Sequence, residues 1–166
     1  MKNVLVVDNS PVLLQLMTKF LEKEELRVET AADGLNALDV LAKFTPDIMF
    51  VDLVMPNIDG KTLCRILRSN EAFKDIYLVI LSAISAEEWI DIREIGADAC
   101  IAKGPFTDMA IHVRSVLENP VEVRARCMAG EVLGVDQVFP RGITQELLSV
   151  KRHFEAILER MAEGII

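Results

Sequence analysis

Cysteine is scarce in this chain of 166 residues, which contains three: Cys64, Cys100 and Cys127. Their number is odd, they are widely spaced, and none belongs to a CxxC pair. The sequence therefore predicts neither a disulfide framework nor a zinc site. A reducing compartment, the cytoplasm, is the simplest location for a chain of this kind.

Positive charge and long apolar segments are also lacking. The chain carries 18 Lys and Arg against 26 Asp and Glu, a formal net charge of −8. Such an acidic chain is poorly suited to direct binding of nucleic acid, which depends on Lys and Arg to neutralise phosphates. The N-terminal run MKNVLVVD is cut off by Asp8, unlike a secretory signal, and no later run approaches a membrane-spanning length. We therefore predict no membrane segment in this chain.

Apolar residues make up 51% of the chain, which is enough for one globular core with some length left over. Short runs of strand type alternate with amphipathic segments of helical length, so that five β-then-α units result. The predicted strands are 3–7, 27–30, 47–51, 77–81 and 99–102, and the predicted helices are 11–25, 35–44, 61–69, 86–95 and 107–117.

The strand runs are nearly uniformly apolar, as expected where helices cover both faces of a parallel sheet. Right-handed crossovers then favour an open, doubly wound α/β sandwich, in which ligands bind beyond the carboxyl ends of the strands. Polar residues follow four of the five predicted strands: Asp8 and Asn9, then Asp52, then Ser82, and finally Lys103. We expect their side chains to converge at one edge of the sheet.

These converging groups suit phosphoryl chemistry. A carboxylate such as that of Asp52 can attack phosphorus to form an aspartyl phosphate, provided that the developing negative charge is neutralised. Magnesium prefers oxygen ligands, which Asp8, Asn9 and Asp52 could supply. Lys103 offers a second cation and Ser82 a hydroxyl donor. Asp52 alone could equally be an ordinary turn-forming residue, so the hypothesis depends on the whole set.

The motifs VLVVDNS, VDLVMPNIDG, LSA and AKGPF, in this order and at this spacing, resemble the receiver domain of two-component response regulators. The resemblance runs from about Lys2 to about Leu117. It implies a flavodoxin-like fold of five βα units with a five-stranded parallel sheet in the order 2-1-3-4-5. It also implies that Met55, Pro56 and Gly60 belong to the loop after the acceptor, with Gly60 beginning the next helix.

The same resemblance implies the roles of the site residues. Asp52 would accept a phosphoryl group from a histidine kinase or phosphotransfer protein, while Ser82 and Lys103 would contact the phosphoryl oxygens. Mg²⁺ would be held by Asp8, Asn9, Asp52 and the backbone carbonyl of Val54. Such a module catalyses its own modification and turns over no external substrate, so we do not expect an enzyme in the usual sense.

Three positions depart from the family pattern. Asn9 stands where the family usually has a second acid, which predicts weaker magnesium binding, although Asn9 could also cap the helix that opens at Ser10-Pro11. Cys100 stands where many relatives carry an aromatic ring and is expected to be a small buried residue. Gly104 is an extra residue before Pro105.

These departures leave open a degenerate, unphosphorylated receiver that serves as a dimerising adaptor. A phosphatase with an aspartyl intermediate is disfavoured, because Ser10 replaces its second acid.

The remaining residues predict an extension of the receiver. Asn119-Pro120 ends the last receiver helix, so we expect a receiver domain at 1–118, a connector at 119–143 with a short helix at 121–129, and a linker helix at 144–166. Its apolar residues have coiled-coil spacing, which favours a homodimer through this helix over packing on its own receiver. HFEAILERMAEGII resembles the lead-in to a PAS domain of hybrid sensor kinases, and the apolar ending GII suggests that the protein continues. The coiled-coil seam is Leu147, Val150, Phe154, Ile157 and Met161.

Overall fold

The computed structural model describes residues 1–83, 91–135, 153–158 and 160. Five strands form one parallel sheet in the order β2-β1-β3-β4-β5. The doubly wound α/β fold predicted from the sequence, with this strand order, is therefore confirmed. The strands are β1 (Asn3–Val7), β2 (Arg27–Ala31), β3 (Ile48–Asp52), β4 (Tyr77–Ser82) and β5 (Ala99–Ala102).

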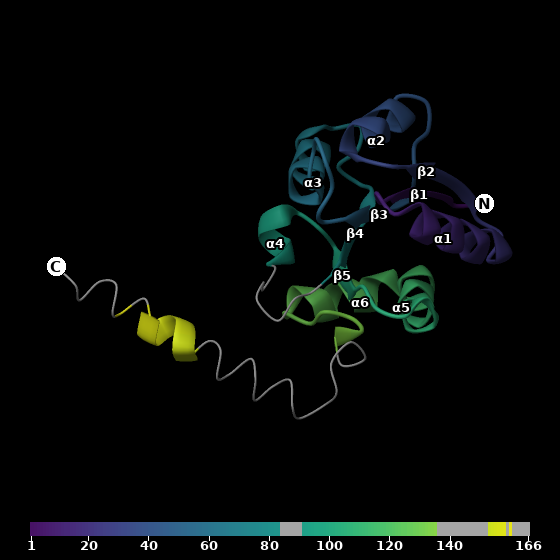
Figure 1. Cartoon of the computed structure of the whole chain (residues 1–166). Coiled ribbons are helices and arrows are strands. Elements are labelled where there is room, and N and C mark those ends of the chain that lie inside the picture. Colours follow the sequence, from purple (N-terminus) through teal and green to yellow (C-terminus); the bar gives the residue numbers. More distant parts are fainter. Residues whose placement is uncertain (84–90, 136–152, 159, 161–166) are drawn as a thin grey trace.

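Helices cover both faces of the sheet. Figure 1 shows α1 and α5 on one face and α2, α3 and α4 on the other. Of the predicted helix 86–95, residues 84–90 lie outside the described part of the chain, and α4 is described from Ile92. The helices are α1 (Pro11–Lys23), α2 (Gly34–Leu41), α3 (Gly60–Ser69), α4 (Ile92–Ile95), α5 (Phe106–Glu118) and α6 (Pro120–Met128).

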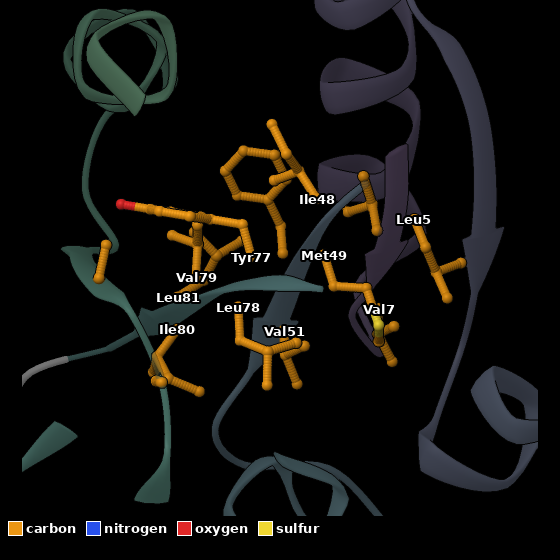
Figure 2. Packing of buried hydrophobic residues seen from close by; sticks show 14 of the residues in the cluster. Leu5, Val7, Ile48, Met49, Val51, Tyr77, Leu78, Val79, Ile80 and Leu81 are labelled. Carbon is orange, nitrogen blue, oxygen red and sulfur yellow. The ribbon is translucent and has the colours of Figure 1, made fainter. Parts of the chain in front are cut away.

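The core lies on the central strands, where helices cover both faces. Every residue of β3 and β4 is buried, whereas β2, at the edge of the sheet, is mostly exposed. Figure 2 shows the apolar side chains of β1, β3 and β4 packed together, among them Val7, Met49 and Leu78. The nearly uniform apolar runs in the sequence thus correspond to strands with two buried faces.

Two helix ends differ from prediction for local reasons. Ser10, and not Asn9, is the N-cap of α1: its side chain accepts a hydrogen bond from the backbone N–H of Leu13 at 3.3 Å. The capping role suggested for Asn9 is therefore wrong. At the other end, α1 stops at Lys23 because Glu25 adopts a left-handed conformation with φ of 61°, which a helix cannot continue.

The loop after β3 is fixed by the start of α3. Asp59 is the N-cap of α3, and its carboxylate accepts a hydrogen bond from the backbone N–H of Thr62 at 2.7 Å. Gly60 is the first residue of the helix, as predicted. The backbone N–H of Gly60 donates to the carbonyl of Leu53 at 3.0 Å, which holds α3 directly against the end of β3.

Residues after α5 continue to pack on the sheet. The short helix predicted at 121–129 is α6, which contacts β5, α5 and α4. Leu133 forms an isolated parallel bridge with Ile101 of β5. Farther along, residues 153–158 are helical, with Phe154 and Ile157 exposed, while the other predicted seam residues, Leu147, Val150 and Met161, lie outside the described residues.

No helix in the described parts of the chain combines the length and apolar character needed to cross a membrane.

Substitution of Gly60 should disturb the turn that carries Asp52. A methyl group on Gly60 would lie 2.3 Å from the backbone oxygen of Asp52, too close for any contact. We expect Gly60→Ala to lower the free energy of unfolding by about 1–3 kcal/mol, measured by urea denaturation. Lys61→Ala, at the exposed next position of the same helix, should change it by less than about 0.5 kcal/mol. Equal stability of Gly60→Ala and the parent chain would contradict this account.

Candidate functional site

Three of the predicted site residues meet at the carboxyl edge of the sheet. The ammonium nitrogen of Lys103 lies 2.7 Å from Oδ2 of Asp8 and 3.0 Å from Oδ1 of Asp52. Asp8 follows β1, Asp52 ends the neighbouring strand β3, and Lys103 follows β5. The convergence expected from the sequence is thus observed for one amine and two acids from distant parts of the chain.

Asp8 is the more deeply buried of the two acids, with no exposed surface. Its Oδ1 accepts a hydrogen bond from the backbone N–H of Ser10 at 2.8 Å, which orients the carboxylate. Apart from the ion pair with Lys103, its Oδ2 has no hydrogen-bond donor among the residues that the structure describes. A buried carboxylate oxygen with unused acceptor capacity is suited to a cation.

Asp52 is 5% exposed, and its carboxyl has a perturbed pKa. Burial raises its pKa above the ordinary value of 3.8, and the nearby Asp8 adds to the rise. Lys103 opposes this by hydrogen bonding and by charge, and the backbone N–H of Val54, 3.4 Å from Oδ1, opposes it weakly. The net direction is upward, so the ionised form of Asp52 is held in the pocket at a cost in free energy.

The extra residue after Lys103 does not prevent its side chain from reaching the acids. The backbone N–H of Lys103 donates to the carbonyl of Ser82 at 2.7 Å, which ties the end of β5 to the end of β4. The described residues contain no cis peptide bond, so Gly104–Pro105 is trans, and α5 begins at the following residue, Phe106. Lys103 keeps a side chain that is about one-fifth exposed and contacts both carboxylates.

The other predicted residues lie at the same edge without joining this contact. Ser82 ends β4 and is 3% exposed, Asn9 is exposed beside Asp8, and Val54 is exposed in the loop after β3. Within the described residues, neither the Ser82 hydroxyl nor the Asn9 amide makes a hydrogen bond to the carboxylates of Asp8 or Asp52. A ligand-contacting role for Ser82, Asn9 and Val54 therefore stays a prediction.

Backbone hydrogen bonds that were not predicted from the sequence orient the two acids. Asp8 and Asp52 each accept a hydrogen bond from the main-chain N–H two residues later, that of Ser10 and that of Val54. This pattern is a local turn that Asp favours, so the signal was present in the residue type. The described residues contain no cluster of three or more His, Cys, Asp or Glu arranged to hold a metal, in keeping with only two acids in this pocket.

Fold and site together define a flavodoxin-like α/β domain with two buried carboxylates and one amine at the carboxyl edge of its sheet. A family model described as the response regulator receiver domain matches residues 4–114, about two-thirds of the chain. The chain therefore belongs to the response regulator receiver domain family. The resemblance noted from its motifs is confirmed.

Relatives carry this domain in proteins of different length. Response regulator PleD of Caulobacter vibrioides is 33% identical over 138 residues, covering 80% of this chain and 30% of PleD. Protein PilG of Pseudomonas aeruginosa is 38% identical over 107 residues, covering 63% of this chain and 77% of PilG. The chain spans only part of several relatives' length: 56% of the DNA-binding regulator RpaA of Synechocystis, 17% of the transcription factor SKN7 of Saccharomyces cerevisiae and 30% of PleD.

Solved structures show the same fold. The response regulator TrrA of Thermotoga maritima, crystallised in complex with Mg²⁺ and BeF, is 28% identical and has a TM-score of 0.59. The match covers 70% of this chain and 99% of TrrA. The chemotaxis response regulator CheY4 of Vibrio cholerae has a TM-score of 0.62 at 25% identity, with 69% of this chain and 97% of CheY4 covered.

The raised pKa of Asp52 predicts a pH dependence of stability with a definite sign. The folded chain holds the proton of the Asp52 carboxyl more tightly than the unfolded chain does. The free energy of unfolding therefore falls as the pH rises through and above the ordinary carboxyl pKa of 3.8. Asp52→Asn removes this loss of stability at higher pH, because the neutral amide carries no charge to bury. We expect the variant to be more stable than the parent at pH 7, by on the order of 1 kcal/mol, with the difference shrinking towards pH 4.

Urea denaturation of both chains across this pH range provides the measurement. Asp39→Asn, at an exposed position on α2, controls for the loss of one negative charge elsewhere on the surface. A variant at Asp52 that is less stable than the parent at every pH would show that the attraction of Lys103 outweighs burial.

Proposed function

We propose that Asp52 is the phosphoacceptor of this receiver and that Lys103, Ser82 and the acidic neighbours of Asp52 form its catalytic surroundings. The observation that carries the proposal is the single ammonium group held within 3.0 Å of two buried carboxylates. In a member of the receiver family this arrangement supplies both a nucleophile and a positive charge for a phosphoryl oxygen.

The transfer itself needs one bond to form and one to break. An oxygen of the ionised Asp52 carboxylate attacks phosphorus and forms an acyl phosphate. The bond from phosphorus to the donor breaks, and its electron pair leaves with the imidazole nitrogen of a phosphohistidine or with the acetate oxygen of acetyl phosphate. Lys103 and the Ser82 hydroxyl then donate hydrogen bonds to the phosphoryl oxygens. The leaving imidazole or acetate departs with the donor, and the chain itself is the phosphorylated product, so each chain reacts once per modification.

The residues around Asp52 fit a magnesium ion. Two carboxylates face one ammonium group, so the three groups together retain one negative charge, and Oδ2 of Asp8 has unused acceptor capacity. We assign Asp8, Asn9, Asp52 and the backbone carbonyl of Val54 as the groups that would hold the ion. When bound, Mg²⁺ supplies positive charge that neutralises the phosphoryl oxygens. TrrA, a relative of similar fold, was crystallised with Mg²⁺ and BeF.

The partner implied by this chemistry is a histidine kinase or a phosphotransfer protein. We place the exchange in the cytoplasm, which suits the reduced cysteines Cys64, Cys100 and Cys127, all buried. The acidic receiver is not expected to contact nucleic acid directly, although the name of the relative RpaA describes a DNA-binding regulator. We also propose a homodimer through the helix at 144–166 and a PAS domain after it. The domain boundaries that we propose are 1–118, 119–143 and 144–166.

A degenerate receiver that serves as an adaptor is the competing function. The amide of Asn9, in place of a second acid beside Asp8, is the observation that favours it, because it removes one negative charge from the cation site. Against it stands the contact of Lys103 with both Asp8 and Asp52, which supports an intact acceptor site.

Incubation with acetyl phosphate and Mg²⁺ separates the two functions. We expect intact-mass measurement to show a gain of one phosphoryl group in the parent chain and none in Asp52→Asn. Lys103→Gln should slow the gain at least about tenfold, since it removes the cation that stabilises the phosphoryl charge. Asp39→Asn on α2 serves as the charge-matched control and should react like the parent. A parent chain that gains no mass would support the adaptor, and a gain that persists in Asp52→Asn would refute the acceptor assignment.

Restoring the missing acid should strengthen the cation site. Asn9→Asp adds a carboxylate beside Asp8, so we expect its dissociation constant for Mg²⁺, measured by titration calorimetry, to fall by about threefold to tenfold. Asn36→Asp adds the same charge at an exposed position on α2 and should leave the affinity unchanged. Identical magnesium affinities for Asn9→Asp and the parent chain would rule out Asn9 as a ligand position.

A further inference from the structure

The residues that follow α5 pack closely on the receiver. Helix α6 contacts β5, α5 and α4, so it covers the β5 edge between the two helical layers, and Figure 1 shows it beside β5 and α5. Val123 and Cys127 on α6 are 1% and 2% exposed. Burial raises the pKa of the Cys127 thiol and of the Cys100 thiol in β5.

Polar contacts fix the beginning of α6. Arg124 Nη2 lies 2.8 Å from Oδ1 of Asp98, a carboxylate that is 6% exposed and whose Oδ2 accepts hydrogen bonds from Arg68 and from the backbone N–H of Leu78. The guanidinium of Arg124 also lies 5.2 Å above the ring of Tyr77. The Tyr77 hydroxyl donates to the carbonyl of Pro120 at 2.8 Å. These contacts tie α6 to the amino ends of β4 and β5.

Leu133 occupies the outer edge of β5. Its backbone N–H donates to the carbonyl of Cys100 at 2.9 Å, and its carbonyl accepts from the N–H of Ala102 at 2.8 Å. Leu133 is 2% exposed, so its side chain is buried with the core. The pairing satisfies edge groups of β5 that would otherwise face solvent.

This pairing reaches the residue next to the site. Ala102, whose N–H is bonded to Leu133, is followed directly by Lys103, whose ammonium group bridges Asp8 and Asp52. The two hydrogen bonds to Leu133 and the bridge from Lys103 to the two carboxylates are thus present in the same structure. A phosphoryl group on Asp52 would add bulk and negative charge where Lys103 now contacts Oδ1, and would draw the ammonium group to a new position.

We propose that residues 119–133 are a docked extension of the receiver and that phosphorylation of Asp52 loosens the pairing of Leu133 with β5. The segment after Leu133 is thereby coupled to the state of Asp52 through a single strand end. This inference rests on the proposed function. By linkage, the factor by which binding at Asp52 shifts the extension towards release equals the factor by which the released state binds more tightly than the docked state, so a variant that releases the extension fully should gain that factor in affinity.

Amide hydrogen exchange followed by NMR tests whether a group bound at Asp52 loosens the pairing of Leu133, in the chain without substitutions. Beryllofluoride with Mg²⁺ serves as the probe in place of a phosphoryl group. We expect the N–H groups of Ala102 and Leu133 to exchange about fivefold faster with the probe bound, while that of Leu78, bonded to Asp98, stays unchanged. Asp52→Asn should abolish the effect.

Variants of the extension test whether loosening it strengthens binding at Asp52. Arg124→Ala removes the ion pair with Asp98, and Leu133→Ala removes the buried side chain at the β5 edge. We expect each to bind beryllofluoride about fivefold more tightly than the parent, measured by calorimetry at fixed Mg²⁺. Arg126→Ala removes the same charge from the same helix, but its partner Glu131 lies within the extension, so its affinity should equal that of the parent.

The outcomes distinguish this inference from the proposed function. A parent chain that binds no beryllofluoride would overturn the proposed function and, with it, the coupling. Binding that depends on Asp52 but leaves the exchange of Ala102 and Leu133 unchanged, with equal affinities for all the variants, would overturn the coupling alone. In that case the extension would be a static cover for the sheet edge.

Discussion

The ammonium group of Lys103 between two buried carboxylates is the interaction on which the site depends. At about 3 Å and an effective dielectric constant of about 20, one such contact is worth roughly 5 kcal/mol of attraction. Lys103 makes this contact with both carboxylates, but removing each ion from water costs several kcal/mol, and by charge count the three groups together keep one negative charge. Burial is the first cause of the raised pKa of Asp52, and the neighbouring negative charge of Asp8 adds to it. These groups are therefore poised to receive further positive charge.

The parallel sheet makes this concentration of charge possible. Because β1, β3, β4 and β5 run in the same direction, residues that follow them in the sequence meet at one edge, however far apart they are along the chain. Strands β3 and β4 are buried on both faces, and between Tyr77 at the start of β4 and the last residues of the two strands, Asp52 and Ser82, their side chains are apolar. A rigid apolar core thus holds the reactive groups, and the loops only orient them.

The sequence predicted those parts of the molecule that follow from periodicity and residue type. Uniform apolar runs identified the strands, and the polar residues at their ends identified Asp8, Asp52 and Lys103 as neighbours. Contacts that depend on geometry between distant segments were not predictable. The pairing of Leu133 with β5 has no periodic signal, since a single buried leucine between glycines reads as connector. The capping of α1 by Ser10 in place of Asn9 was a choice between two adjacent residues with similar preferences.

The covered edge of β5 also limits how this receiver can assemble. An open strand edge invites pairing with another chain, but Leu133 already uses the carbonyl of Cys100 and the N–H of Ala102. The opposite edge, β2, carries the exposed residues Arg27 and Glu29, and charged side chains oppose strand pairing there. Association of two copies through the sheet is therefore disfavoured at both edges by the chain's own sequence. An interface formed by helices, such as the one proposed for residues 144–166, avoids both obstacles.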